Sequence, residues 1–103
     1  MARQMMITQA NRNALPALYA QDGSGMNATA YVHYFSANMD FYATEFDGEN
    51  TFFGYIVNHT HGSDGEFGYF HLSTLEECAS HRVFGGIERD MHFTPQTIGN
   101  VRN

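Results

Sequence analysis

Apolar and aromatic residues alternate with polar residues in five stretches of the chain, a pattern typical of β-strands. Tyr, Phe, Val and Ile dominate these stretches, and such side chains suit a pleated sheet surface. The sequence DGEN at 47–50, between two of the stretches, indicates a hairpin. The predicted strands are Ala30 to Ser36, Asp40 to Phe46, Thr51 to Asn58, Glu66 to Leu72 and Ile87 to Phe93.

Capping signals predict three short helices around these strands. Hydroxyl side chains stand where each helix would begin, and such residues accept hydrogen bonds from free backbone N–H groups. The predicted helices run from Thr8 as N-cap to about Leu15, from a Ser73–Glu76 capping box to about His81, and onward from the pair Thr94-Pro95.

The predicted element order is α-β-β-β-β-α-β-α. Short connections favour antiparallel neighbours, so we expect an α+β fold with a twisted, mainly antiparallel five-stranded sheet and short helices. Within the stretch 51–58, Phe53, Tyr55 and Val57 alternate with Phe52 and Ile56. Both faces of this strand are therefore apolar, and either both are covered or one carries an exposed aromatic patch.

Length and charge restrict the function classes. A chain of 103 residues accommodates one domain, residues 1–103. Its net charge of −6, with five Arg and no Lys, argues against affinity based on phosphate contacts, so we expect no direct nucleic-acid binding. The single cysteine, Cys78, excludes an internal disulfide and a multi-cysteine zinc site. With no signal-peptide pattern and no apolar run of the roughly 20 residues that span a bilayer, we expect a cytoplasmic protein without membrane contact.

Several motifs occur in order along the chain: LPALY at 15–19, TEFDG at 44–48, TFFG at 51–54, GYF at 68–70, LSTLE at 72–76 and IERD at 87–90. In these motifs the chain resembles a bacterial family, the domain of unknown function numbered twenty-nine fifty-eight, which is typical of plasmids, phages and other mobile elements. The resemblance implies a mobile-element protein, but no activity, cofactor or catalytic residue, because none is established for that family. The pair Asp40-Phe41 and the His-rich loop 59–64 depart from the family pattern.

The His-rich loop is a candidate metal site. His59, His61 and Asp64 supply three possible ligands within six residues, and imidazole with carboxylate suits zinc. His71 on the adjoining strand becomes a fourth ligand only if the loop folds back. The alternative is a solvated hairpin loop, which polar residues in such a connection favour.

Two pairs of carboxylates form a second candidate site. Alternation places both members of each pair on the same side of a strand. If the two strands are neighbours, the four groups meet with Arg82 or Arg89 nearby, and they are able to bind Mg²⁺ or act in acid–base chemistry. Alternatively, the carboxylates cap a turn and pair with arginines. The pairs are Glu45 with Asp47 and Glu88 with Asp90.

Two further features are expected to be structural. Nothing lowers the thiol pKa of Cys78 beside His81 or supplies an oxyanion hole, so we expect a small buried residue rather than a nucleophile. The alternating aromatics resemble a base-stacking platform, but such platforms need basic surroundings, which favours core packing here.

These observations favour a small, acidic, non-enzymatic accessory protein of a mobile genetic element. It is expected to bind another protein, such as a basic nucleic-acid-binding enzyme, with inhibition of a CRISPR or restriction nuclease as one role. We expect no cofactor, and the oligomeric state stays open. The alternative is a small enzyme or metal-binding domain that uses the four carboxylates, or the His59/His61 loop, with zinc or magnesium. The candidate binding surface is Tyr42, Glu45, Asp47, Glu88, Arg89 and Asp90.

Overall fold

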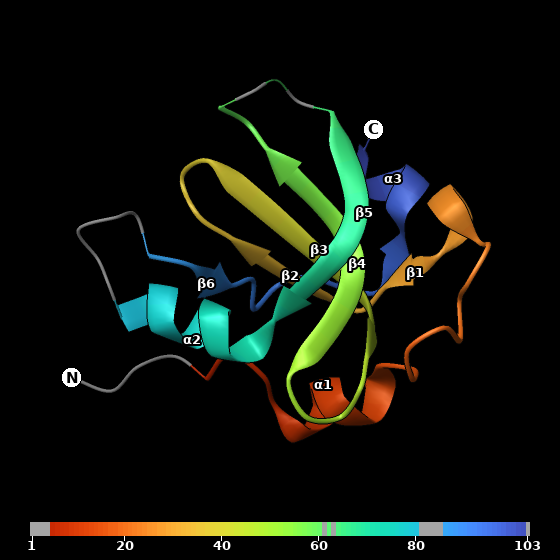
Figure 1. The fold of residues 1–103 in the computed structure, drawn as a ribbon, viewed down its shortest axis with the longest axis horizontal. Coiled ribbons are helices and arrows are strands. Elements are labelled where there is room, and N and C mark those ends of the chain that lie inside the picture. The colour runs from red at the N-terminus through yellow and green to blue at the C-terminus, as the bar shows by residue number, and fades with distance from the viewer. Residues whose placement is uncertain (1–4, 61, 63, 81–85, 103) are drawn as a thin grey trace.

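A five-stranded antiparallel sheet forms the centre of the molecule and confirms the predicted α+β class. The computed structural model describes residues 5–60, 62, 64–80 and 86–102. The strands follow the order β5-β4-β3-β2-β6, and the sheet is strongly twisted (Figure 1). They are β2 (Val32–Phe35), β3 (Met39–Phe46), β4 (Thr51–Asn58), β5 (Gly65–His71) and β6 (Glu88–Arg89).

Short elements surround this sheet. The strands β1 and β7 pair with each other as a separate two-stranded sheet, which the sequence patterns did not predict. The surrounding elements are α1 (Gln9–Ala14), the 3₁₀ helix η1 (Gly25–Asn27), β1 (Thr29–Ala30), α2 (Leu72–Ser80), β7 (Gln96–Thr97) and α3 (Ile98–Arg102).

The start of α1 confirms the predicted N-cap. The Asn11 backbone N–H donates to the Thr8 hydroxyl at 3.0 Å, and the Asn11 side chain accepts from the Thr8 N–H at 3.0 Å. This reciprocal pair satisfies two backbone N–H groups at the start of the helix. The helix ends at Ala14, one residue before the predicted end and two before Pro16, whose ring is incompatible with a helix interior.

The predicted starts of the other two helices are wrong. α2 begins at Leu72, so Ser73 lies in its first turn rather than at its cap. Asn50 takes the capping role from the β3–β4 turn, because its carbonyl accepts from the Leu72 N–H and its side chain from the Ser73 N–H, each at 2.8 Å. At the C-terminus, the residues after Pro95 first form β7, and α3 then begins at Ile98.

Two predicted strands are also shorter than the alternation suggested. Residues 30–36 are divided at Tyr31 into β1 and β2, because Ala30 pairs with β7 while β2 pairs with β3 and β6. Of the predicted strand 87–93, only Glu88 and Arg89 pair with β2. The strand ends there because the Asp90 side chain accepts from the His92 N–H at 3.0 Å and closes a turn.

One face of the sheet, here called the closed face, carries the larger core. Phe46, Phe52 and Phe70 pack on this face with ring centroids 4.4 and 5.1 Å apart in successive pairs. Residues before and after α1 and along α2 cover the rings, so the face is closed to solvent. The covering residues are Met6, Ile7, Leu15, Leu72 and Leu75.

The opposite face, here called the open face, is covered only in its centre. Tyr55 and Val57 pack there against Ala28, Ala30 and Ile98 from the β1, β7 and α3 region. The sequence left open whether both faces are covered or one carries an exposed aromatic patch, and each alternative is partly correct. Both faces have a cover, and aromatic side chains of the open face remain accessible beyond the edge of that cover.

A β-bulge in β3 changes which side chains reach the open face. The register between β3 and β4 shifts between Ala43 and Glu45, so Thr44 is the extra residue. Asp40 and Tyr42 precede the bulge and lie on the open face opposite Val57 and Tyr55. After the bulge, odd-numbered Glu45 lies on that same face, opposite Phe53.

Beside the bulge, the close approach of β3 to Gly54 predicts that a larger residue at this position destabilises the fold. A methyl group on Gly54 would collide with the Tyr42 carbonyl oxygen of the adjacent backbone. Gly54→Ala should therefore lower the free energy of unfolding in urea by about 1–3 kcal/mol. Gly68, the cross-strand partner of Gly54, is the matched control, because a methyl group there would approach only Ile56 Cδ1 at 3.6 Å. Gly68→Ala should change the free energy by about 0.5 kcal/mol or less; equal losses in both variants would contradict the prediction.

Candidate functional site

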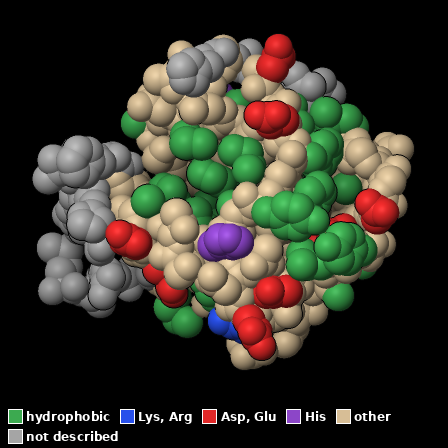
Figure 2. Space-filling view, viewed as in Figure 1, with side chains coloured by type: hydrophobic (Ala, Val, Ile, Leu, Met, Phe, Trp, Pro, Cys, Tyr) green, Lys and Arg blue, Asp and Glu red, His purple; other side chains and the backbone are tan. Residues whose placement is uncertain are grey.

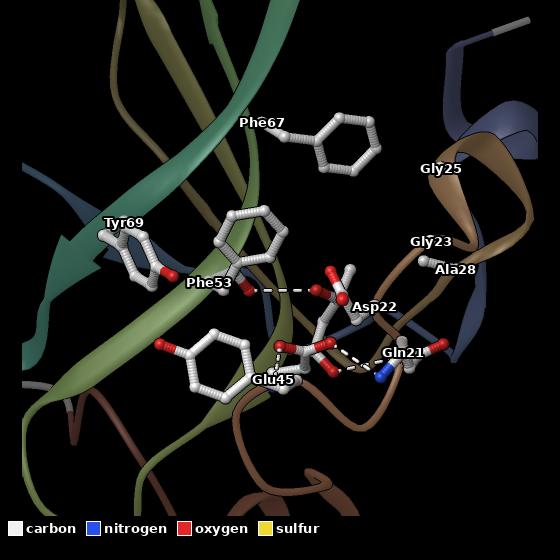
Figure 3. Close-up of a pocket in the computed structure, with 11 residues that line it drawn as sticks. Gln21, Asp22, Gly23, Gly25, Ala28, Glu45, Phe53, Phe67 and Tyr69 are labelled. Atoms are coloured by element: carbon white, nitrogen blue, oxygen red, sulfur yellow. Dashed lines mark hydrogen bonds between the residues drawn. The ribbon is translucent and has the colours of Figure 1, made fainter.

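A cavity of about 350 Å³ opens on the open face between the β4–β5 hairpin and the segment that connects α1 to β1. We call it the aromatic pocket. Figure 3 shows the rings of Phe53, Phe67 and Tyr69 facing Glu45 and Asp22 across this space. Its lining residues are Tyr19, Gln21, Asp22, Gly23, Gly25, Ala28, Thr44, Glu45, Phe53, Phe67 and Tyr69.

The aromatic wall follows from the register of the sheet. Glu45, Phe53 and Tyr69 are cross-strand partners, and Phe67 lies on the same face one pair farther along. The Phe53 ring lies 5.1 Å edge-on from Tyr69 and 6.0 Å stacked from Phe67, measured between ring centroids. Tyr69 is 53% exposed, so part of this wall is open to a ligand.

Glu45 lies at the base of the pocket and is only 3% exposed. One carboxylate oxygen accepts from the Tyr19 backbone N–H at 2.7 Å and the other from the Gln21 backbone N–H at 2.8 Å. Two acceptor oxygens are the pattern of an ionised carboxylate. The carboxylate thus fixes the chain after α1 to the sheet, and this segment forms the second wall of the pocket.

Gln21 extends this attachment with its side-chain amide. Its nitrogen donates to the carbonyls of Thr29 and Thr44, each at 2.9 Å, and its oxygen accepts from the Thr29 N–H at 2.7 Å. The amide therefore bridges β1 and β3 at the bulge. Tyr19 has a φ of 74°, a left-handed conformation that is uncommon outside glycine, which these hydrogen bonds hold in place.

The pocket carries negative charge. The Tyr19 hydroxyl hydrogen-bonds to Tyr69 and raises the pKa of its phenol, and the negative charges of Glu45 and Asp22 raise that pKa further. Among the residues that the structure describes, no Arg or His lines the pocket. Figure 2 shows hydrophobic side chains beside acidic ones on the face toward the viewer.

A second polar group of side chains, here called the His33 network, lies at the opposite side of the open face. His33 Nε2 is 2.6 Å from Asp40 Oδ1, and His33 Nδ1 is 3.0 Å from Asp90 Oδ2. The other Asp40 oxygen is 2.7 Å from His59 Nε2. The network joins β2, β3, the end of β4 and the turn after β6, with His59 at its most exposed end.

The ring of Tyr42 packs against this network, and the charges of the network affect the pKa of its phenol. It stacks on the His33 ring with centroids 4.4 Å apart and planes inclined by 6°. Burial, followed by the charges of Asp40 and Asp90, raises the pKa of Tyr42 to about 12. Burial also raises the pKa of Asp90, but hydrogen bonds from His33 and the His92 N–H outweigh it and hold that pKa below 3.8.

The structure does not bring the predicted binding residues into one surface. Tyr42 and Asp90 belong to the His33 network, and Glu45 belongs to the aromatic pocket. Asp47 lies in the β3–β4 turn, where the N–H groups of Thr51, Glu49 and Asn50 donate to it and lower its pKa. The remaining two lie on β6, where Glu88 is exposed and the Arg89 side chain donates to the Met5 carbonyl at 2.8 Å.

The hypothesis of four meeting carboxylates is wrong. It required the strands of Glu45 and Glu88 to be neighbours, but β2 lies between β3 and β6. Asp47 lies beyond the end of β3, where its carboxylate accepts from the N–H groups of the turn, and backbone N–H groups rather than an arginine satisfy Glu45. The carboxylates that do come together are Asp40 and Asp90, on either side of His33.

The predicted zinc ligands are also dispersed where the structure describes them. His59 contacts Asp40, whereas His71 pairs with Thr51 at the other end of β4. Asp64 is exposed before β5, and His61 lies outside the described residues. Within the described ranges, no three His, Cys, Asp or Glu side chains are grouped to hold a metal ion. Cys78 is half-buried on α2, less enclosed than expected.

Local sequence patterns did not indicate Asp22, Phe67 or Asp40 as site residues. Their roles depend on strand register and on contacts between residues far apart in the chain, such as His33 and Asp90, which are 57 positions apart. The combination of a DGSG segment and an aromatic hairpin was the available signal for the pocket.

Searches of protein-family models, curated proteins and solved structures found no match to the chain. None of the helices in the described part of the chain is long and apolar enough to cross a membrane.

The first prediction for this site concerns Glu45. Glu45→Gln replaces one acceptor oxygen by a donor that faces a backbone N–H, so the free energy of unfolding should fall by about 1–3 kcal/mol. Hydrogen exchange at the Tyr19 and Gln21 amides should accelerate. The matched control is Glu49→Gln in the exposed turn, which should shift stability by about 0.5 kcal/mol or less. Unchanged exchange at both amides would show that Glu45 does not hold this segment.

The second prediction concerns the pH dependence of Asp90. Its pKa is lower in the folded protein than the ordinary 3.8, so its ionised form stabilises the fold above that pH, and this stabilisation is lost as the pH falls through the folded value. Asp90→Asn lacks this component. Between about pH 5 and pH 2, the wild type should therefore lose more unfolding free energy than Asp90→Asn.

Glu88→Gln, which removes an exposed carboxylate two positions earlier, is the control for Asp90→Asn. Urea unfolding curves collected at several pH values measure all three proteins. The curve of Glu88→Gln should run parallel to the wild type, and a parallel curve for Asp90→Asn would count against a role of the His33 network in stability.

Proposed function

We propose that this chain is a small acidic accessory protein that acts by binding a basic protein partner through the aromatic pocket. The observation that carries the proposal is the composition of that pocket, in which exposed rings face Glu45 and Asp22 with no basic lining residue. Aromatic side chains in a partly open, concave site are typical anchors for protein recognition.

Net charge supports the choice of partner. At −6, the chain attracts positively charged surfaces over distances near the Debye length, about 8 Å at physiological salt, and repels nucleic acid. Nucleic-acid-binding enzymes present basic surfaces of this kind. Charge then accelerates the encounter, and the aromatic pocket supplies the apolar contact that lengthens the lifetime of the complex.

The resemblance to a mobile-element family supports a biological setting for this binding. A plasmid or phage protein that covers the basic surface of a host CRISPR or restriction nuclease would protect the element that encodes it. We therefore propose an anti-defence role without enzymatic chemistry. The enzymatic alternative required the strands of Glu45 and Glu88 to be neighbours, but β2 lies between them, and among the described residues no three His, Cys, Asp or Glu side chains are grouped to hold a metal ion.

The proposal is tested by infecting bacterial strains with phage. Each strain carries one defined restriction or CRISPR system. Expression of the wild-type chain should raise plating efficiency at least tenfold against one of these systems. The double variant Phe67→Ala/Tyr69→Ala should lose that protection, because it removes two rings of the pocket. Biolayer interferometry with the purified nuclease should show binding at least tenfold weaker for the double variant.

Met91→Ala is the matched control, since Met91 is a large apolar residue that is 69% exposed and does not line the pocket. It should protect and bind as the wild type does. Equal binding of the nuclease by the wild type and the double variant would contradict the proposal, as would unchanged plating with every system.

A further inference from the structure

The Glu45 carboxylate is a buried charge without a cationic partner. It is 3% exposed, and no Arg or His forms an ion pair with it among the residues that the structure describes. The two backbone N–H groups use one lone pair on each oxygen, and each oxygen has a second. A buried carboxylate is stabilised when a cation approaches it, so the pocket favours a positively charged ligand.

The walls of the pocket favour the same ligand class. The negative faces of aromatic rings attract cations, and Phe53, Phe67, Tyr69 and Tyr19 line this cavity. Asp22 adds a second carboxylate at the opposite wall (Figure 3). The volume of about 350 Å³ is near the lower end of ligand pockets, which suits a single side chain rather than a large molecule.

A guanidinium group matches this arrangement better than an ammonium group. It is planar, stacks on rings and presents five N–H donors in a fixed fork, so one face is able to contact a ring while the edge donates to carboxylates. The chain already contains one such contact on its closed face. The Arg12 guanidinium carbon lies 5.6 Å from the Phe46 ring centroid, and its Nη1 donates to the Gly48 carbonyl at 3.1 Å.

We propose that the aromatic pocket binds the side chain of an arginine presented by the partner protein, with its guanidinium against the rings and its N–H groups directed to Glu45 and Asp22. This inference rests on the proposed function, since it names the group by which the basic partner is recognised. Binding of an arginine would also supply the cationic partner that the buried Glu45 carboxylate lacks among the described residues.

The test uses three short peptides and the ¹⁵N-labelled full chain. The sequences are acetyl-Gly-Arg-Gly-amide, its lysine counterpart and its citrulline counterpart, which is nearly isosteric with arginine but neutral. The arginine peptide should shift the backbone amide signals of Tyr19, Gln21 and Asp22 in a saturable titration. The lysine and citrulline peptides should each bind at least tenfold more weakly.

Variants separate a specific site from general attraction to an acidic protein. Asp22→Asn and Tyr69→Leu should each weaken the arginine peptide at least threefold, and both positions are exposed enough to leave the fold intact. Glu76→Gln on α2 makes the same change in net charge as Asp22→Asn but lies outside the pocket, so it should bind as the wild type does.

Three results would overturn the arginine assignment: equal affinity for the citrulline peptide, equal affinity for the lysine peptide, or equal loss of binding in Glu76→Gln and Asp22→Asn. If the arginine peptide fails while Phe67→Ala/Tyr69→Ala still abolishes nuclease binding, only this inference fails. If neither the peptide nor the nuclease depends on the pocket, the proposed function fails with it.

Discussion

The hydrogen bonds from the Tyr19 and Gln21 backbones to the buried Glu45 carboxylate hold the second wall of the aromatic pocket in place. The segment between α1 and β1 contains only the short helix η1, so little regular structure stabilises it. An ionised acceptor forms stronger hydrogen bonds than a neutral one, and burial strengthens them further. The same group therefore organises the segment and leaves negative charge facing the cavity, so structure and recognition depend on one side chain.

The open face separates two kinds of polar site by an apolar cover. Ala30, Tyr55 and Ile98 pack in its centre, with the aromatic pocket toward β5 and the His33 network toward β6. The carboxylates in the His33 network are engaged by imidazoles, whereas the donors to Glu45 in the described part of the chain are backbone N–H groups. This contrast explains why the pocket, and not the more conspicuous cluster of histidines and aspartates, is the better candidate for binding a cation.

Local patterns predicted the main strands because alternation and turn signals act over a few residues. The bounds of β4 agree fully with the prediction, and Thr8 caps α1 as its hydroxyl indicated. The two-residue pair β1–β7 escaped prediction because so short a stretch has no periodicity, and its pairing joins positions far apart in the chain. The His33 network was missed for a related reason: it depends on which strands lie side by side, and β2 separates the two strands whose carboxylates were expected to meet. The contacts of Glu45 are with backbone atoms, which no side-chain motif records.

The extra residue at Thr44 makes the length of β3 as important as its composition. Side chains alternate with a period of two, so regular pairing of β3 with Thr44 retained and no bulge would reverse every position between Thr44 and the next turn. Glu45 would then enter the apolar layer occupied by Phe46, and the phenyl ring would take its place beside Phe53. Point substitutions along this strand alter single contacts, whereas loss of the bulge with every residue retained would exchange the two surfaces of the strand after Ala43. Deletion of Thr44 alone would instead restore regular pairing and keep Glu45 opposite Phe53, so the length of this strand and its bulge are expected to change together.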